Sequence, residues 1–300
     1  MESSITPAGF AGSHAAPQPF LSSNSDLLSP AATPPADGRG LSLRECFQTQ
    51  CRVIGALIMR EMLTRYGRHN IGFLWLFAEP MMFTLGVTVL SNIMGAVKGD
   101  GISVTAFVLT GYSTILLWRN MPSRCLSALG PNHSLMFHRQ VKPIDVYFSR
   151  LILEATGATI SLVILSIIFI ASGLVEPPKD YLSAALGWGL LAWYAFAISL
   201  LVGAISERTE MIERVWHIFQ YLMIPLSGSF FIVDALPKAF QNLVLWNPTV
   251  NCTELFREGF FGASHTWHYS IEYVVVFNMM LTLLGLAQVR YISRNLVLEQ

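Results

Sequence analysis

The sequence predicts an all-α integral membrane protein with six transmembrane helices, an N-terminal interfacial helix and short re-entrant helices before the last span. Hydrophobic residues make up 53% of the chain and charged residues only 13%, about half the 25% that is usual in soluble domains. Long apolar segments recur, and Lys and Arg gather in alternate connections between them. We therefore expect hydrocarbon to be the solvent for much of the chain.

The apolar segments define the expected spans. A spanning helix needs about 20 mostly apolar residues, because the hydrocarbon core is about 30 Å thick. The segments that satisfy or approach this length are 71–95, 103–118, 151–175, 181–206, 215–233 and 269–289. Before them we expect a cytoplasmic interfacial helix over 41–70 and a disordered tail over 1–40, which is rich in Ser, Ala, Pro and Gly. Residues 71–300 then form a six-helix transmembrane domain.

The basic residues predict the orientation of these spans. Fifteen of the 19 Lys and Arg residues fall in the two terminal segments and in the second and fourth connections. Short connections rich in Lys and Arg stay in the cytoplasm. Both termini of this multi-pass chain are therefore expected to be cytoplasmic.

Two connecting segments have more apolar content than ordinary loops. Residues 43–68 combine Val, Ile, Leu and Met with several Arg residues, which is typical of a helix on the inner leaflet. The alternative is a basic flank that only sets topology. Residues 234–268 are rich in Leu, Phe and Trp, which favours short re-entrant helices, permitted where protein or a wet cavity satisfies the backbone. A helical cap lying in the interface is the alternative.

Mixed aromatic and polar strips are candidates for a substrate path. Glu79 lies inside the first span and precedes Pro80, and a carboxylate at membrane depth must face protein or water. Aromatic faces and a carboxylate suit a hydroxyl-rich ligand, although Glu79 also fits a structural pair with an arginine. The candidate path residues in the first and fifth spans are Trp75, Glu79, Met82, Phe83, Trp216, Gln220, Met223, Ser227 and Phe230.

Several chemical functions have no motif in this sequence. It contains no GxxxxGK[ST] phosphate-binding loop, no HExxH or GxSxG motif and no CxxC pair among its four cysteines. We therefore expect no catalytic site, no metal and no cofactor on this chain, and any ATP hydrolysis must occur on another chain. Acidic and basic residues are equal in number, so the charge balance predicts no nucleic-acid partner.

Three runs of residues resemble a known family. They are LIMREMLTRYGRHNIGFLWLFAEP from residue 57, LTGYSTILLWRN from residue 109 and NHSLMFHRQVKPIDVYFSRLILEATGATI from residue 132. The residues of these runs and the order of the runs along the chain resemble those of the ABC-2 type permeases of capsule-polysaccharide exporters in Gram-negative bacteria. The resemblance covers about residues 44–286 and leaves the first 40 without a counterpart.

The resemblance implies an assembly in the bacterial inner membrane. A second copy of the chain, two ATPase subunits carrying ATP and Mg, and periplasmic and outer-membrane polysaccharide export proteins are the implied partners, and a lipid-linked polysaccharide is the substrate. The N-terminal helix and the second connection contact the ATPases in that family, and the short connection 207–214 joins them. The implied ATPase contacts are Arg60, Arg65, Arg68, Asn132, Leu135, His138 and Lys142.

Two other functions compete with this interpretation. An ABC-2 exporter of O-antigen, teichoic acid or a drug shares the fold and motor and differs only in cargo. A membrane-embedded glycan-modifying enzyme needs acids or a histidine clustered near one leaflet, whereas the histidines of this sequence are scattered along the chain.

Overall fold

The computed structural model describes residues 42–66, 71–93, 102–132, 136, 141–262 and 265–298; the side chains of 65–66, 71–77, 91–92, 210 and 295–298 are not described. All regular structure within these ranges is helical. The elements are α1 Leu43–Tyr66, α2 Ile71–Ile93, α3 Val104–Cys125, η1 Gly130–Asn132, α5 Pro143–Ala171, α6 Tyr181–Ser206, α7 Glu210–Met223, η2 Val233–Ala235, α8 Lys238–Val244, α9 Pro248–Phe261 and α10 Ile271–Leu298.

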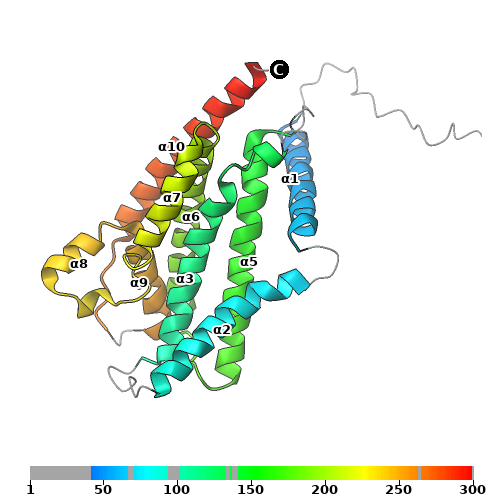
Figure 1. Cartoon of the computed structure of the whole chain (residues 1–300). Coiled ribbons are helices and arrows are strands. Elements are labelled where there is room, and N and C mark those ends of the chain that lie inside the picture. Colours follow the sequence, from blue (N-terminus) through cyan, green and yellow to red (C-terminus); the bar gives the residue numbers. More distant parts are fainter. Residues whose placement is uncertain are drawn as a thin grey trace, which may run out of the picture. The chain divides into compact units, whose positions relative to one another are not determined.

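Residues Arg44–Gln300 form one compact unit, and from α2 through α3 and α5 to α6 consecutive long helices run in opposite directions (Figure 1). The end of α2 meets the start of α3, where the hydroxyl of Thr88 bonds that of Thr105 at 3.1 Å. Among the described residues, α5, α6 and Ile271–Arg294 of α10 are long and apolar enough to cross a membrane, and Ala78–Leu90 of α2 is a shorter apolar helix.

Several helices extend beyond the predicted spans at the end of the bundle that carries α1. The predicted span 181–206 coincides with α6, whereas α3 continues to Cys125 and α5 begins at Pro143. Proline has the φ angle of a first helical residue and lacks the N–H that would be unpaired there. The Asp145 carboxylate then accepts the backbone N–H of Lys142 at 2.9 Å. These caps explain why α5 begins before the apolar segment does.

The fifth predicted span, 215–233, differs most from the structure. The helix α7 ends at Met223 after 14 residues, about 21 Å at 1.5 Å per residue. Pro225 follows, and Gly228 has a φ of +80°, a backbone conformation that glycine adopts without steric cost. Residues 224–232 therefore turn, and the short elements η2, α8 and α9 follow before α10 begins.

The buried guanidinium of Arg257, on α9, binds this turning segment. Its side chain has no exposed surface, and it donates to the backbone carbonyls of Gly228 at 2.7 Å, Ser229 at 2.5 Å and Phe231 at 2.7 Å. The guanidinium also lies 4.0 Å from the ring centroid of Phe107 on α3. The backbone carbonyls of the turning segment, which have no helical N–H partner, thus accept hydrogen bonds from the side chain of Arg257.

Glu254, one turn before Arg257, binds the other side of the same region. Its carboxylate accepts the backbone N–H of Val233 at 3.2 Å and that of His268 at 3.5 Å. The side chain is fully buried. The two charged residues of α9 therefore fix the segments that lead into η2 and α10.

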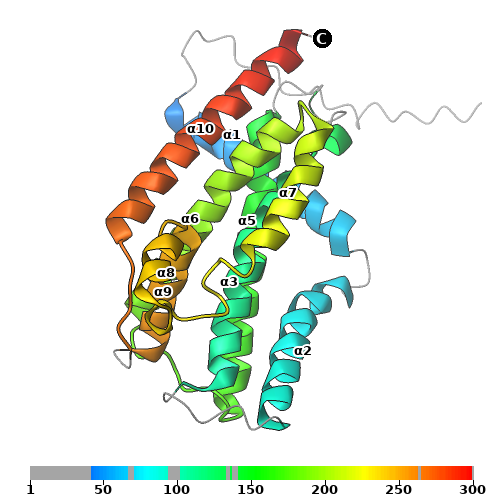
Figure 2. The same ribbon diagram turned by 60° about the vertical axis from the view of Figure 1, so that its left-hand side comes forward.

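Helix α6 lies at the centre of the bundle and packs against α3, α9 and α10, as Figures 1 and 2 show. Small residues allow its backbone to approach α9 closely, as is common between membrane helices. A Cβ atom on Gly187 of α6 would lie 2.4 Å from the backbone nitrogen of Phe256, and one on Gly259 of α9 would lie 2.2 Å from that of Ala184. These two glycines set the separation of α6 and α9.

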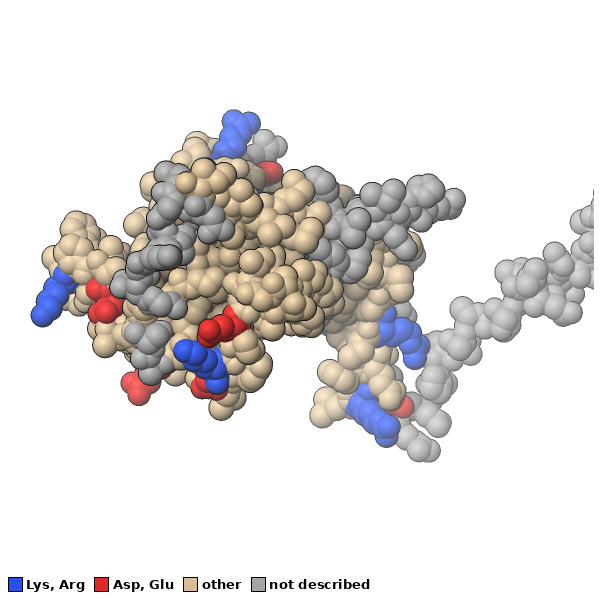
Figure 3. Space-filling model, turned by 90° about the horizontal axis from the view of Figure 1, so that it is seen from below, with Lys and Arg blue, Asp and Glu red and all other residues tan. Residues whose placement is uncertain are grey.

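The end of the bundle opposite the C-terminus has few charges on its described surface. Seen from that end in Figure 3, most of the coloured surface is uncharged, with scattered Lys, Arg, Asp and Glu side chains. The turn between α5 and α6, with Glu176, Lys179 and Asp180, lies there. Hydrogen bonds from Ser183 and from the Leu182 N–H lower the pKa of Asp180 below its usual value.

Substitution of Gly187 tests the close contact of α6 and α9. Gly187→Ala is expected to lower stability by about 1–3 kcal/mol, because a methyl group must displace backbone atoms. Thermal unfolding of the purified protein in detergent measures this. Gly189→Ala is the matched control, since Gly189 lies on the same helix with no heavy atom within 4 Å of its Cβ position. Equal melting temperatures for both variants would contradict the packing described.

Substitution of Arg257 tests the binding of the turning segment. Arg257→Gln leaves at least one buried carbonyl without a donor, and each such carbonyl costs about 1–3 kcal/mol. We expect a large fall in the melting temperature and in the recovery of monodisperse protein, measured by size-exclusion chromatography after heating. Arg290→Gln, at an exposed position on α10, is the control. Arg257 would have no such role if both variants behaved alike.

Candidate functional site

Glu79 forms a small cluster with two aromatic residues on neighbouring helices. The hydroxyl of Tyr112, on α3, donates to its carboxylate at 3.3 Å. The ring of Phe83, one turn after Glu79 on α2, stacks on Tyr112 with 4.1 Å between centroids. We call Glu79, Phe83 and Tyr112 the Glu79 cluster. The side chains of Arg65, at the end of α1, and of Arg68 lie outside the described residues, so a structural pair of Glu79 with an arginine stays an alternative.

The Glu79 cluster faces away from the bundle interior. Glu79 is exposed, and Phe83 and Met82 expose 38% and 58% of their surface. The side chain of Trp75, the remaining candidate on this helix, lies outside the described residues. The exposed candidates present aromatic, thioether and carboxylate groups together. The sequence analysis did not identify Tyr112 as a candidate path residue, because nothing in the sequence pairs it with Glu79.

The candidates of the fifth predicted span do not share one environment. Trp216 packs in a small core with Leu126, just after α3, and Val202 of α6, and Gln220 accepts a serine hydroxyl of α3 at 3.1 Å. Ser227 is buried and bonds a neighbouring serine at 2.9 Å, while Met223 is half-buried. Only Phe230 is exposed, at 54%. The three buried residues hold α7 and its turn onto the bundle.

The other candidate surface joins α1 to the second connection. Nη1 of Arg60 donates to Oδ1 of Asn132 at 2.7 Å, and Asn132 in turn donates to the carbonyl of Ala128 at 2.8 Å. Arg150, near the start of α5, pairs with Glu61 of α1 at 3.5 Å. These polar contacts link α1, which has little other packing, to η1 and to the start of α5. We call this set the α1 contact.

The connection between α6 and α7 reaches the same region. Glu207 accepts the backbone N–H of Leu129 at 2.7 Å, and Glu213 accepts the hydroxyl of Ser127 at 3.2 Å. Burial raises the pKa of Glu207, although the Leu129 N–H acts in the opposite direction. The three segments expected to meet an ATPase are thus brought to one end of the bundle.

The individual ATPase candidates are placed unevenly. Arg60 and Asn132 bond each other, and Lys142 is exposed at the start of α5. Arg68, Leu135 and His138 and the side chain of Arg65 lie outside the described residues. The pairs Arg150–Glu61 and Arg124–Glu154, the latter at 3.1 Å, involve residues that were not among the candidates. Their charges were visible in the sequence, but their partners on other helices were not.

The chemistry available at both surfaces is that of contact and support. In the described part of the chain no three His, Cys, Asp or Glu side chains are placed to hold a metal ion. All four cysteines are free, and Cys125 and Cys252 are buried. The Glu79 cluster presents aromatic faces and a carboxylate acceptor at the surface, and the α1 contact links α1 to η1 and α5 through polar side chains.

Comparison with known proteins gives the family. The family model described as ABC-2 type transporter matches residues 52–261. BexB of Haemophilus influenzae, a capsule polysaccharide export inner-membrane protein, is 36% identical over 259 residues, covering 86% of this chain and 98% of its own.

Two further relatives are similar to this chain over a comparable length. CtrC of Neisseria meningitidis serogroup B, also a capsule polysaccharide export inner-membrane protein, is 39% identical over 254 residues, covering 85% of this chain and 96% of its own. KpsM of Escherichia coli, a polysialic acid transport protein, is 28% identical over 250 residues, covering 82% and 96%. With its apolar helices, the chain is a multi-pass inner-membrane protein, and it belongs to the ABC-2 type transporter family.

Proposed function

We propose that this chain is the membrane-spanning subunit of an ATP-driven exporter that moves capsular polysaccharide across the bacterial inner membrane. One observation carries the proposal: relatives named for capsule export are 36% and 39% identical over 86% and 85% of this chain. The likeness also covers nearly the whole of each relative, so it extends to a complete permease subunit and not to one motif.

The power for transport is supplied by a separate ATPase in this proposal. The sequence has no phosphate-binding loop, so ATP and Mg are bound by a partner, with two ATPase subunits beneath two copies of this chain. The α1 contact supports a coupling role, because Arg60–Asn132 ties α1 to η1 and Glu61–Arg150 ties it to α5. A push on α1 is thereby passed to the segment after α3 and to α5.

Six crossings with both termini in the cytoplasm complete the proposed topology. The fifth crossing consists of α7 and the turning segment 224–232, and α8 and α9 are re-entrant elements on the outer side. The positions of the connections support this, since α1, the second connection and the α6–α7 connection lie at one end of the bundle. Periplasmic and outer-membrane export proteins then receive the polymer on the other side.

The exposed part of the candidate path consists of the Glu79 cluster, Met82 and Phe230. A polymer has to slide, so its contacts must be weak and repeated, as they are for ions in channels. Aromatic faces stack on sugar rings and the Glu79 carboxylate accepts hydroxyl hydrogen bonds, each a modest interaction. Two copies of the chain, facing each other across the glycan, provide the two walls.

Deletion of the gene tests the proposed function. We expect the deletion strain to lose its surface capsule and to accumulate the polymer in the cytoplasm, with recovery when the gene is restored on a plasmid. Capsule staining of intact cells and quantification of glycan in cell lysates measure the two pools. Normal surface capsule in the deletion strain would overturn the proposal.

Glu79→Gln tests the path within the working exporter. The neutral amide is a weaker acceptor, and the loss of a charged hydrogen bond of roughly 1 kcal/mol corresponds to about a fivefold fall in export. Membrane-inserted protein should stay at the level of the unchanged chain. Tyr112→Phe is the control, because it removes the intramolecular bond and keeps the carboxylate, so export should fall less. Loss of inserted protein in Glu79→Gln would instead assign the carboxylate to folding.

A further inference from the structure

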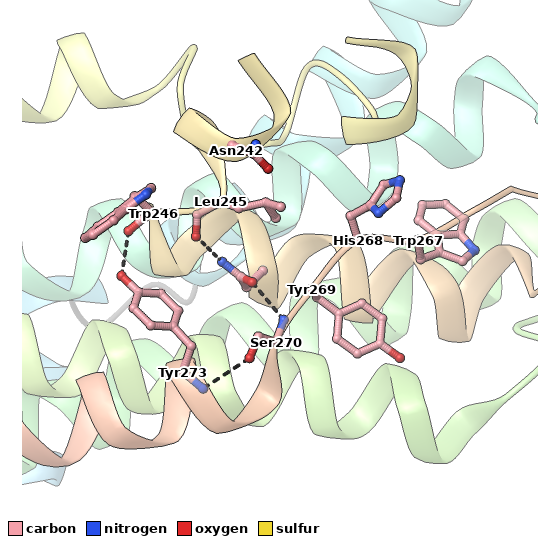
Figure 4. Close-up of a pocket in the computed structure, with 9 residues that line it drawn as sticks. Asn242, Leu245, Trp246, Trp267, His268, Tyr269, Ser270 and Tyr273 are labelled. Carbon is pink, nitrogen blue, oxygen red and sulfur yellow. Dashed lines mark hydrogen bonds between the residues drawn. The ribbon is translucent and has the colours of Figure 1, made fainter. Parts of the chain in front are cut away.

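A cavity separate from the Glu79 cluster lies among α8, the start of α9 and the start of α10. Its volume is about 570 Å³, within the range of roughly 300–1,000 Å³ that is usual for ligand sites. Figure 4 shows Trp246 at one end of the cavity and Trp267 at the other, with Asn242 of α8 on one side and Tyr273 of α10 near Trp246. We call this cavity the outer pocket.

The walls of the outer pocket are held in place by hydrogen bonds. The hydroxyl of Tyr273 donates to the carbonyl of Trp246 at 2.7 Å, and the indole N–H of Trp267 donates to the carbonyl of Gly262 at 2.8 Å. Buried Asn251 binds the carbonyl of Leu245 at 2.7 Å and the N–H of Ser270 at 2.9 Å. Three separate segments are thus tied together around a cavity that exists before any ligand arrives.

These bonds distinguish the pocket from an interfacial aromatic belt. An aromatic anchor keeps its polar tip in the wet headgroup layer and its ring in the apolar region. Here the polar tips of Tyr273 and Trp267 are used within the protein, and Phe261 stacks behind Trp267 at 15° between the ring planes. Trp246 as a whole residue is 76% exposed. The aromatic faces, rather than the polar tips, are available to a ligand.

The polar groups around these rings are mostly uncharged. Of the described residues that line the pocket, none is Lys, Arg, Asp or Glu, and the amide of Asn242 has no hydrogen bond to another described side chain or backbone group. Tyr269 contributes a phenol hydroxyl, which is neutral at physiological pH. At the margin of the outer pocket, Nε2 of His268 lies 3.4 Å from Oδ1 of Asp234. Hydrogen bonds from Thr266 and His268 lower the pKa of the Asp234 carboxyl below its usual value.

We propose that the outer pocket is a saccharide-binding site, in which Trp246 stacks on a sugar ring and Asn242 bonds its hydroxyls. Exposed aromatic faces beside neutral amides match a ring that has an apolar face and a hydroxyl edge, whereas a phosphate or sulfate would require a cation. The site rests on the proposed export function, which makes the emerging glycan its ligand. In this proposal the outer pocket holds a short stretch of the glycan at the end of the bundle opposite the α1 contact.

Titration of oligosaccharide into the purified protein tests the site. The probe is the short oligosaccharide released by mild acid from the capsule of the producing strain, titrated by calorimetry into the full-length chain in nanodiscs without glycoside detergent. Saturable, weak binding is expected, with the dissociation constant raised about tenfold in Trp246→Ala, which equals 1.4 kcal/mol. Trp246→Tyr retains an aromatic face and should lose much less, which separates stacking from folding.

Phe240→Ala provides the matched control, because Phe240 is an exposed aromatic residue of α8, six residues before Trp246, that does not line the pocket. Its binding should equal that of the unchanged chain. The saccharide site is overturned if the probe fails to bind, or if Trp246→Ala and Phe240→Ala bind it alike. If either binding result is obtained while deletion of the gene still abolishes the surface capsule, only the saccharide site in the outer pocket is rejected. A deletion strain with normal capsule rejects the export function as well.

Discussion

A chain in hydrocarbon must satisfy every backbone N–H and C=O from within the protein, and this constraint is hardest to satisfy where α7 stops. The guanidinium of Arg257 binds three carbonyls of the turn that follows, and the carboxylate of Glu254 binds two N–H groups nearby. Because these bonds replace helical ones, the chain can leave the helix at Met223 and still remain among apolar neighbours. The positions of η2, α8 and α9, and of the outer pocket that they border, depend on these side-chain hydrogen bonds to the backbone.

The two ends of the bundle solve different problems. At the end that carries α8 and α9, small residues such as Gly187 and Gly259 bring α6 and α9 into backbone contact, and the buried charges of Glu254 and Arg257 bind an irregular segment. At the α1 end, pairs such as Glu61–Arg150 join separate helices through long, partly exposed side chains. Arg150 and Glu61 expose only 15% and 29% of their side-chain surface, so this pair is partly shielded from water. In the proposed mechanism these links pass a movement of α1 to η1 and α5.

Hydrophobic runs were sufficient to predict much of the fold. The segment 181–206 is apolar throughout and begins after Asp180, and α6 has the same bounds. The end of α7 was not predictable in this way, because residues 224–233 are as apolar as a span and the bonds that turn them come from Arg257, nearly 30 residues later. Similarly, helical spacing put Trp216, Gln220 and Phe230 on one strip, but spacing does not reveal which neighbour covers it, and Trp216 and Gln220 pack against other helices. Glu79 was identifiable as a charge at membrane depth, whereas Tyr112 became visible only when α2 and α3 were seen side by side.

The orientation of the chain is the central claim of the proposed mechanism, since the α1 contact must meet an ATPase while the outer pocket opens to the periplasm. Single-cysteine labelling measures it, after the exposed Cys46 and Cys51 are replaced by serine. One reporter is Lys238→Cys on α8 and the other Arg214→Cys on α7, both at exposed positions. With an impermeant maleimide on cells whose outer membrane is permeable, residue 238 should react at once and residue 214 only after the inner membrane is opened. Labelling of residue 214 in sealed cells, with residue 238 protected, would contradict the account.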